Sequence, residues 1–253
     1  MRVLILGGTW EARQLAERLG ARREFAVTLS LAGRTATPAA VSVPVRIGGF
    51  GGAEGLARYV SAQHIEALVD ATHPYAAAIS ANCANAARMT GVRFLALRRS
   101  PWAPVEGDRW TEVDDVSAAA NALGGVPRRV FLALGRKELT PFVAAPYHYY
   151  VVRSVDPVDP PLDLPHVDYL VGRGPYREAD ERALLVARQI EIIVAKNSGG
   201  AATYGKIAAA RALSLPIVML RRPVLPAAPS VETVERAMAW LDHGDLPCAA
   251  RGV

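Results

Sequence analysis

Short runs of β-branched and aliphatic residues alternate with longer helical stretches along almost all of this 253-residue chain. The first run, Val3–Leu6, ends in glycine, and the stretch Glu11–Leu19 that follows carries apolar residues at the spacing of one helix face. Alternation of this kind is typical of a parallel sheet covered by helices, because a parallel crossover needs a connection about as long as a helix. The pattern therefore predicts an α/β protein built from parallel sheets.

The same reading extends to the rest of the chain. Further strands are expected at 26–30, 43–47, 67–69, 93–97, 130–134, 149–153, 169–171, 192–195 and 217–220. Further helices are expected at 53–63, 76–90, 116–123, from 138 onward, and at 179–189, 201–213 and 231–241.

Proline marks a break in this alternation. Ten of the 18 prolines fall between residues 101 and 175, and Pro101-Trp102-Ala103-Pro104 directly follows the strand that ends near Arg98. Proline neither continues a helix nor donates to a sheet ladder, so the chain is expected to cross between domains at 99–112. We therefore predict two domains, residues 1–100 and 101–253.

Composition excludes several classes of protein. The net charge is +5, yet no four Lys or Arg residues are consecutive, which argues against a nucleic-acid-binding tail. Cys83 and Cys248 lie far apart without metal-ligand spacing, so we expect a reducing compartment, no disulfide and no metal site. Apolar runs stay well below the roughly 18–20 residues of a membrane helix. These features predict a soluble cytoplasmic protein that binds no membrane.

Lysine is rare in this chain and unevenly placed. The three lysines are Lys137, Lys196 and Lys206, and each lies near a predicted strand-to-helix connection. Gly135-Arg136-Lys137 and Lys196-Asn197-Ser198-Gly199-Gly200 follow strands, and Gly172-Arg173-Gly174-Pro175-Tyr176 is a third such exit. Cations on flexible backbone at one sheet edge favour a binding site for an anionic ligand, although surface lysines are more often solvent-facing charges.

The first predicted strand enters its helix through Gly7-Gly8-Thr9-Trp10-Glu11. Small residues at such a turn leave backbone N–H groups and the positive helix end open to a phosphate. Thr9 and Ala12 replace the second and third glycines of the dinucleotide-binding fingerprint. Thr9 either donates its hydroxyl to a phosphate or caps the helix.

The second strand continues into Ser30–Thr35, which holds one arginine, Arg34, and no acid. An arginine at this place favours the 2′-phosphate of NADPH over the 2′-hydroxyl of NADH, although Arg34 could also be a solvated loop charge. The later Gly48-Gly49-Phe50-Gly51-Gly52 either brings backbone near the same ligand or forms a flexible turn.

A polar segment follows the fourth predicted strand. Asp70-Ala71-Thr72-His73-Pro74-Tyr75-Ala76 lies at the strand end where ligands of open α/β folds bind. His73 is the one histidine of five in such a position, and it either handles a proton near neutral pH or has a structural role.

Five motifs, in their order along the chain, resemble those of the precorrin-6A reductase family of cobalamin biosynthesis. They lie at residues 7–11, 70–76, 135–137, 172–176 and 196–200. The resemblance spans residues 3 to about 223. It implies two Rossmann-like α/β domains with the active site in the cleft between them, the first domain binding NADPH and the second supplying substrate-binding loops. It also implies reduction of one double bond of the precorrin-6A macrocycle to give precorrin-6B.

The resemblance implies two sets of site residues. The NADPH contacts would be Gly7, Gly8, Thr9, Trp10, Glu11, Arg34, Thr72, His73 and Tyr75. The contacts to the acetates and propionates of the tetrapyrrole would be Arg136, Lys137, Lys196, Ser198, Gly199, Tyr204 and Lys206. Hydride transfer needs a proton on the neighbouring carbon, for which Lys137, Tyr75 and water are the alternatives, and His73 is a third catalytic candidate.

Three other functions remain open, and two further classes of enzyme are disfavoured. A cobalt-precorrin-6A reductase and a non-enzymatic NADP-binding regulator remain alternatives, as does a tetrapyrrole methyltransferase that binds S-adenosylmethionine. A short-chain dehydrogenase needs a Tyr-x-x-x-Lys pair, and no tyrosine here has a lysine four residues later. The phosphate-loop motif of NTPases is also absent from the sequence.

Overall fold

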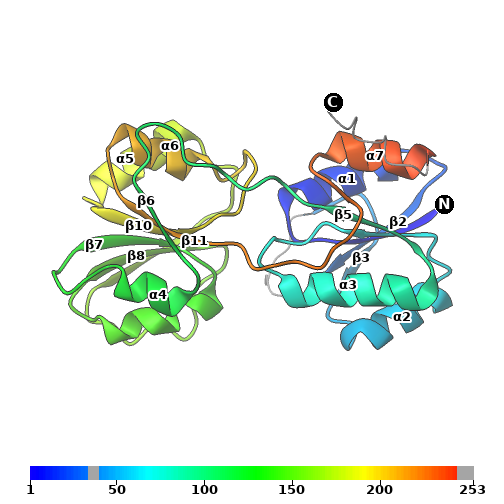
Figure 1. Cartoon of the computed structure of the whole chain (residues 1–253), viewed down its shortest axis with the longest axis horizontal. Helices are drawn as coiled ribbons and strands as arrows, with labels where there is room; N and C mark the ends of the chain where they lie inside the picture. The colour runs from blue at the N-terminus through cyan, green and yellow to red at the C-terminus, as the bar shows by residue number, and fades with distance from the viewer. Residues whose placement is uncertain (34–39, 244–253) are drawn as a thin grey trace, which may run out of the picture. The chain divides into compact units, whose positions relative to one another are not determined.

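The computed structural model describes residues 1–33 and 40–243, which form two compact units. Unit 1 contains Met1–Ser100 together with the segment that starts at Pro223, and unit 2 is Pro101–Arg222. Each unit has a six-stranded sheet in which all strands are parallel (Figure 1). The prediction of an α/β fold with two parallel sheets is confirmed.

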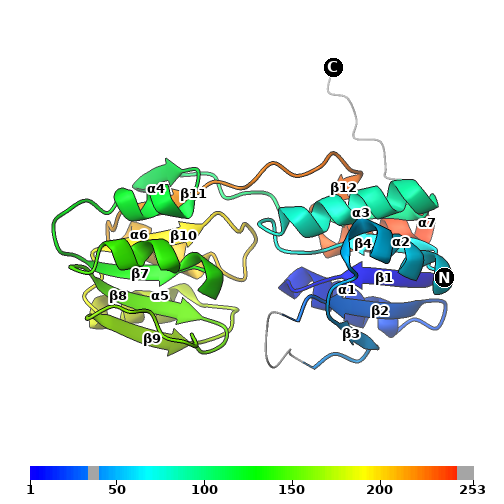
Figure 2. The same cartoon turned by 90° about the horizontal axis from the view of Figure 1, so that it is seen from below.

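In unit 1 the strand order is β3-β2-β1-β4-β5-β12. Helices α1 and α7 cover one face of this sheet, and α2 and α3 cover the other (Figures 1 and 2). The strands are β1 Arg2–Leu6, β2 Ala26–Leu31, β3 Val45–Ile47, β4 Ala67–Asp70, β5 Arg93–Leu97 and β12 Ser230–Val231. The helices are α1 Trp10–Gly20, α2 Gly52–Ala62, α3 Ala77–Thr90 and α7 Val234–His243.

The two faces of this sheet are apolar because successive strand residues point to opposite sides. Val3 and Ile5 of β1 pack in the core beneath α1 and α7, and Leu4 and Leu6 pack in the core beneath α2 and α3. A continuous apolar run is what a strand buried on both faces requires.

In unit 2 the strand order is β9-β8-β7-β10-β11-β6. The strands are β6 Trp110–Val113, β7 Arg129–Ala133, β8 Tyr149–Ser154, β9 Val167–Val171, β10 Ile192–Lys196 and β11 Ile217–Leu220. The helices are α4 Val116–Asn121, α5 Glu178–Ala187 and α6 Gly205–Ala212, with 3₁₀ helices η1 Arg136–Glu138 and η2 Thr140–Ala144 between β7 and β8.

The units follow the same order, which is that of dinucleotide-binding domains, but they obtain the sixth strand differently. After β5 the chain crosses to unit 2, where β6 pairs with β11. After β11 it returns, and β12 pairs with β5. Each sixth strand therefore comes from the segment that follows the fifth strand of the other unit.

This topology changes the domain limits expected from the sequence. The first stretch of unit 1 ends at Ser100, inside the expected crossing, but β12 and α7 belong to unit 1 rather than to a 101–253 domain. In α7, the buried residues Val234, Ala237 and Leu241 join the core formed by β1 and α1. The chain returns to unit 1 because α7 buries apolar residues against the sheet face that α1 also covers.

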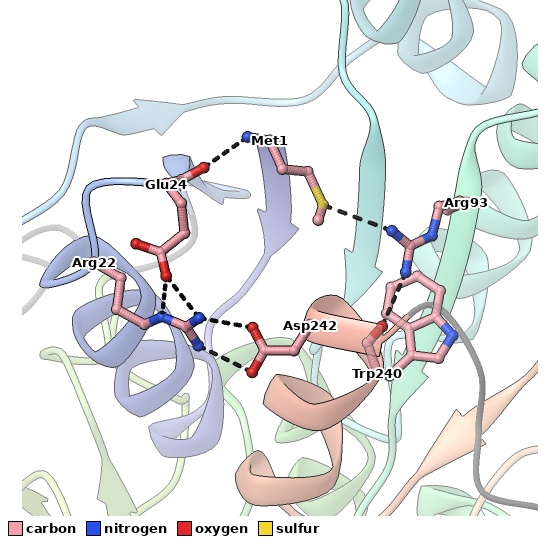
Figure 3. A network of polar contacts seen from close by, with 6 residues as sticks. All are labelled: Met1, Arg22, Glu24, Arg93, Trp240 and Asp242. Atoms are coloured by element: carbon pink, nitrogen blue, oxygen red, sulfur yellow. Dashed lines mark hydrogen bonds and ion pairs between the residues drawn. The ribbon is translucent and has the colours of Figure 1, made fainter.

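Polar contacts also hold α7 to unit 1 (Figure 3). Arg22 forms ion pairs with Glu24 at 2.7 Å and with Asp242 of α7 at 2.8 Å. The hydrogen bond from Arg22 lowers the pKa of Asp242. Arg93 donates to the Trp240 carbonyl at 2.9 Å and lies over the indole ring.

The secondary structure differs from the prediction mainly in four places. The helix expected from residue 138 is the 3₁₀ pair η1 and η2, since a continuous α-helix from Arg136 would need an N–H at residue 141, which is proline. The helix expected at 201–213 begins only at Gly205, after turns that contain Gly199 and Gly200 at positive φ. Strands β6 and β12 were not predicted.

Candidate functional site

In unit 1 the neighbouring strands β1 and β4 lead into connections on opposite sides of the sheet, which makes their carboxyl ends a topological switch point. A Cβ at Gly7 would lie 2.6 Å from Cδ1 of Leu29 and 3.2 Å from Cβ of Ala12, so a larger residue there would require the buried Leu29 side chain to shift. Gly8 has φ +122° and open space around its Cα, so it supplies a conformation that other residues rarely adopt and lets a ligand approach the backbone. The turn therefore suits a phosphate.

The Thr9 side chain caps α1. Its Oγ1 accepts from the Ala12 N–H at 3.1 Å and donates to the Ala71 carbonyl at 2.8 Å, which ties the β1–α1 turn to the end of β4. Because a hydroxyl has one proton, the geometry favours the capping alternative over donation to a phosphate. Any phosphate contact at this residue then comes from its backbone N–H.

A cavity of about 160 Å³ lies beside this turn. Its lining comes from the ends of β1, β2, β3 and β4 and from α2 and α3. It includes Gly7, Ser30, Gly48, Gly49, Phe50, Gly51, Gly52, Leu56, Thr72, Ile79 and Asn82. Arg46 of β3 donates to the carbonyls of Gly48 and Gly49, and its guanidinium lies 3.8 Å from the Phe50 ring centroid. The glycine-rich segment is thus fixed by Arg46 and faces the cavity.

The segment after β4 is ordered by its own polar groups. Asp70 is 2% exposed, and its Oδ1 accepts from the N–H and the hydroxyl of Thr72 at 3.1 and 2.7 Å. Nδ1 of His73 accepts from the Tyr75 N–H at 3.3 Å, and the two rings lie 5.6 Å apart. His73 and Tyr75 are therefore brought together at this edge of unit 1.

Of the remaining predicted cofactor residues, Trp10 is 41% exposed beside the turn, while Glu11 is buried. The Glu11 carboxylate pairs with Arg99 at 2.9 Å, which neutralises a negative charge next to the expected phosphate. Arg34, the expected 2′-phosphate contact, lies outside the described residues.

Unit 2 has its own switch point, between β7 and β10. Glu138 of η1 accepts from the Gly135 N–H at 2.8 Å and forms an ion pair with Lys196 at the end of β10. Lys137 and Arg136 are exposed on the same short helix. The Gly135–Glu138 turn and Lys196 are thus brought together, with Lys196 engaged by a carboxylate of the protein.

The third predicted loop joins this group through the backbone. The Tyr176 N–H donates to the Ala202 carbonyl at 3.0 Å, and a Cβ on Gly205 would lie 2.6 Å from the Tyr176 carbonyl oxygen. The loop of Gly172 to Tyr176 therefore packs against the segment that follows Gly199. The Tyr204 hydroxyl bonds to Arg211, whose other partner is Asp108 at 2.9 Å.

Lys206 lies in the first turn of α6, as its position in the sequence predicts, but its surroundings differ from a binding-site lysine. The residue is 4% exposed, Nζ donates to the Thr203 carbonyl at 2.8 Å, and it lies 5.0 Å from the Trp102 ring centroid. This geometry assigns Lys206 to the packing of unit 2 and argues against contact with a substrate.

Sequence reasoning missed Arg46, Glu138 and Trp102. No local sequence pattern marks Arg46, whose role depends on its hydrogen bonds to the carbonyls of Gly48 and Gly49. Glu138 lies three residues after Gly135, the spacing at which a glutamate reaches back to the N-cap N–H, but glycine lacks the side chain that would complete a recognisable capping box. Trp102 bonds to residues almost 100 positions away, and no local pattern reports such a contact.

No helix in residues 1–33 and 40–243 combines the length and apolarity that crossing a membrane requires. No cluster of three or more His, Cys, Asp or Glu side chains in those ranges could hold a metal ion. Cys83 is buried, and burial raises the pKa of its thiol.

Comparison with known proteins adds a family match. Residues 2–242 match the model of the family described as "Precorrin-6x reductase CbiJ/CobK". A protein of Sinorhizobium sp named precorrin-6A reductase is 56% identical over 246 residues, covering 97% of this chain and 94% of the relative. A cobalt-precorrin-6A reductase of Priestia megaterium is 28% identical, covering 87% of this chain and 90% of the relative. A solved structure named CobK precorrin-6A reductase has 46% identity and a TM-score of 0.92, covering 100% of this chain and 99% of that one.

Proposed function

Because the chain belongs to the precorrin-6x reductase family, we propose that it uses NADPH to reduce one double bond of metal-free precorrin-6A, giving precorrin-6B in cobalamin biosynthesis. The observation that carries the proposal is full-length similarity. Relatives from Sinorhizobium sp and Rhodobacter capsulatus named precorrin-6A reductase are 56% and 47% identical, against 28% for the cobalt-precorrin-6A reductase. The metal-free macrocycle is therefore favoured over the cobalt form.

The unit 1 edge fits a dinucleotide. The open backbone at Gly8 and the capped start of α1 suit the pyrophosphate, and the cavity walled by Gly48–Gly52 suits the adenosine half. Gly7, Gly8, Thr9, Trp10, Thr72, His73 and Tyr75 are the residues that would hold NADPH there, with Arg34 proposed for the 2′-phosphate. When bound, NADPH supplies the hydride.

The unit 2 edge suits a polycarboxylate. Arg136 and Lys137 present positive charge on η1, and a charge-assisted hydrogen bond to a carboxylate is about twice as strong as a neutral one. Lys196 is held by Glu138, so a substrate carboxylate at that place would share or exchange an existing partner. Ser198, Gly199 and Tyr204 follow on the same loop and remain proposed contacts.

Proton delivery has candidates on both units. Nδ1 of His73 accepts a hydrogen bond from the Tyr75 N–H, so this nitrogen acts as an acceptor. Tyr75 lies against His73, and Lys137 is exposed on unit 2. Lys137, Tyr75 and water are proposed as alternative donors, with His73 orienting Tyr75.

The test is a spectrophotometric assay of NADPH loss with precorrin-6A and cobalt-precorrin-6A in parallel, and with NADH in place of NADPH as the control. We expect rapid oxidation of NADPH with the metal-free substrate and a lower specificity constant in the other arms. Oxidation with neither macrocycle would refute the proposal, and NADPH binding without tetrapyrrole binding would support a regulator instead.

A further inference from the structure

Asn197 lies between two proposed substrate contacts, Lys196 and Ser198, yet it is only 6% exposed. Both ends of its side-chain amide bind the backbone of Trp102. Oδ1 accepts from the Trp102 N–H at 2.8 Å, and Nδ2 donates to the Trp102 carbonyl at 2.8 Å. Because one partner group donates and the other accepts, this pairing requires both ends of a neutral amide.

Trp102 belongs to the first of the two segments that connect the units, two residues after unit 1 ends at Ser100. Arg222 belongs to the second, as the last residue of unit 2 before Pro223. Its Nε donates to the Asn197 carbonyl at 2.7 Å. One residue at the end of β10 therefore binds both connecting segments.

The Trp102 side chain extends the same attachment along the loop. Its Nε1 donates to the Gly200 carbonyl at 2.9 Å, and its ring lies edge-on to Tyr204 at 5.8 Å. The Lys206 ammonium is 5.0 Å from the ring centroid. The loop between β10 and α6 is thus built around an indole that comes from the first connecting segment.

The connecting segments are also held together within unit 1. The Arg98 N–H donates to the Val231 carbonyl at 2.8 Å, and Nη1 donates to the Pro226 carbonyl at 3.0 Å. Each connecting segment is therefore attached in both units, and on the unit 2 side Asn197 binds both segments.

We propose that Asn197 is a positioning residue for the reduction, which places Lys196 and Ser198 by fixing their loop to both connecting segments. The inference rests on the proposed function. It assigns Asn197 no contact with the substrate or the cofactor, since its amide is already used by Trp102.

The sharpest variant is Asn197→Asp, which keeps the acceptor for the Trp102 N–H but sets a second oxygen against the Trp102 carbonyl. Losing one buried hydrogen bond of this kind is expected to raise the KM for precorrin-6A roughly tenfold. The Kd of NADPH, measured by fluorescence titration, should stay within about twofold, because its proposed site is in unit 1. Asn121→Asp, on the exposed end of α4, makes the same chemical change away from the loop and should leave both constants unaltered.

A second measurement does not depend on turnover. Asn197→Ala removes the acceptor of the Trp102 amide, so hydrogen exchange of that amide should speed up in Asn197→Ala more than in Asn197→Asp. Trp102→Phe keeps both backbone bonds to Asn197 but loses the bond to Gly200, and it should give a smaller rise in KM. This variant carries the test if Asn197→Asp does not fold.

Four outcomes overturn the inference. Two concern the folded Asn197→Asp variant: its KM for precorrin-6A is unchanged, or its Kd for NADPH rises as much as its KM does. The other two are a lower melting temperature as the sole effect of the substitution, and hydrogen exchange of the Trp102 amide at the same rate in Asn197→Ala as in the unaltered protein. If the unaltered protein oxidises no NADPH with precorrin-6A, the proposed function itself fails, and this result is distinguishable from the others.

Discussion

Units 1 and 2 have the same strand order, but the connection after their first central strand is different. In unit 1, β1 leads through Gly7 and Gly8 into the eleven-residue helix α1, whose start is capped by Thr9. In unit 2, β7 leads through Gly135 into the 3₁₀ turns η1 and η2, which carry Arg136 and Lys137. Under the proposed function, one scaffold would bind anions by backbone N–H groups in unit 1 and by side-chain charge in unit 2.

The largest expected effect concerns the backbone of unit 1. Gly8→Ala forces a residue with a Cβ into φ +122°, a strain of roughly 1–3 kcal/mol that a displaced turn would relieve. We expect the Kd of NADPH to rise about tenfold or more in a fluorescence titration. Gly124→Ala is the matched control, because Gly124 has φ +74° and open space but lies in unit 2. An equal loss in both variants would show that general destabilisation, not the turn, is measured.

Side-chain charge in unit 2 gives the next effect. Lys137→Ala removes an exposed cation from η1 and should raise the KM for precorrin-6A roughly tenfold, as expected for a lost charge-assisted bond. NADPH binding should be nearly intact, and Lys137→Arg should retain most of the activity. Arg182→Ala removes the same charge from the exposed side of α5 and serves as the control. Loss of cofactor binding in Lys137→Ala would contradict the division between the units.

A variant of Lys206 tests whether this lysine packs within unit 2 or binds the substrate. Lys206→Met keeps a side chain of similar length against Trp102 and removes the ammonium that donates to Thr203. Steady-state kinetics should give a KM for precorrin-6A within about twofold of the unaltered protein. A rise as large as that of Lys137→Ala would return Lys206 to the substrate site.

The smallest expected effect is on the pH dependence of the free energy of unfolding, and it comes from His148 of unit 2. His148 is 0% exposed, burial lowers its pKa from the ordinary 6.5, and Nδ1 accepts from the Arg128 N–H. The folded state therefore binds this proton less readily than the unfolded chain, so the free energy of unfolding falls as the pH drops below 6.5. The slope ends below the lowered pKa, where both states are protonated, and one proton contributes at most about 1.4 kcal/mol per pH unit.

Chemical denaturation between pH 5 and 8 checks this slope. His148→Asn keeps an acceptor near the Arg128 N–H without a titrating ring, and it should flatten the slope. His64→Asn is a suitable control, because His64 is exposed and its φ of 50° is one that asparagine tolerates. An unchanged slope in His148→Asn would assign the pH dependence to other groups.

The central strands were predictable because a strand buried on both faces is a continuous apolar run, as in β1 and β10. The edge strands were not: β6 exposes Thr111 and Glu112, and β12 has two residues. The pairing of β12 with β5 joins positions more than 130 residues apart, so periodicity alone could not place α7 in unit 1.

The candidate sites divide in the same way. Gly7, Gly8 and the segment from Asp70 were readable because their role depends on a local turn at a strand end. The burial of Lys206 and the pairing of Lys196 with Glu138 depend on neighbours brought by the sheet order, which residue type and spacing do not report.

The return of the chain to unit 1 has a genetic consequence. A product that stops after Arg222 would contain every strand of unit 2 but would lack β12 and α7, so the apolar side of Val3 and Ile5 would keep α1 and lose the cover that α7 supplies. A premature stop codon late in the reading frame is therefore expected to impair the unit encoded at its beginning.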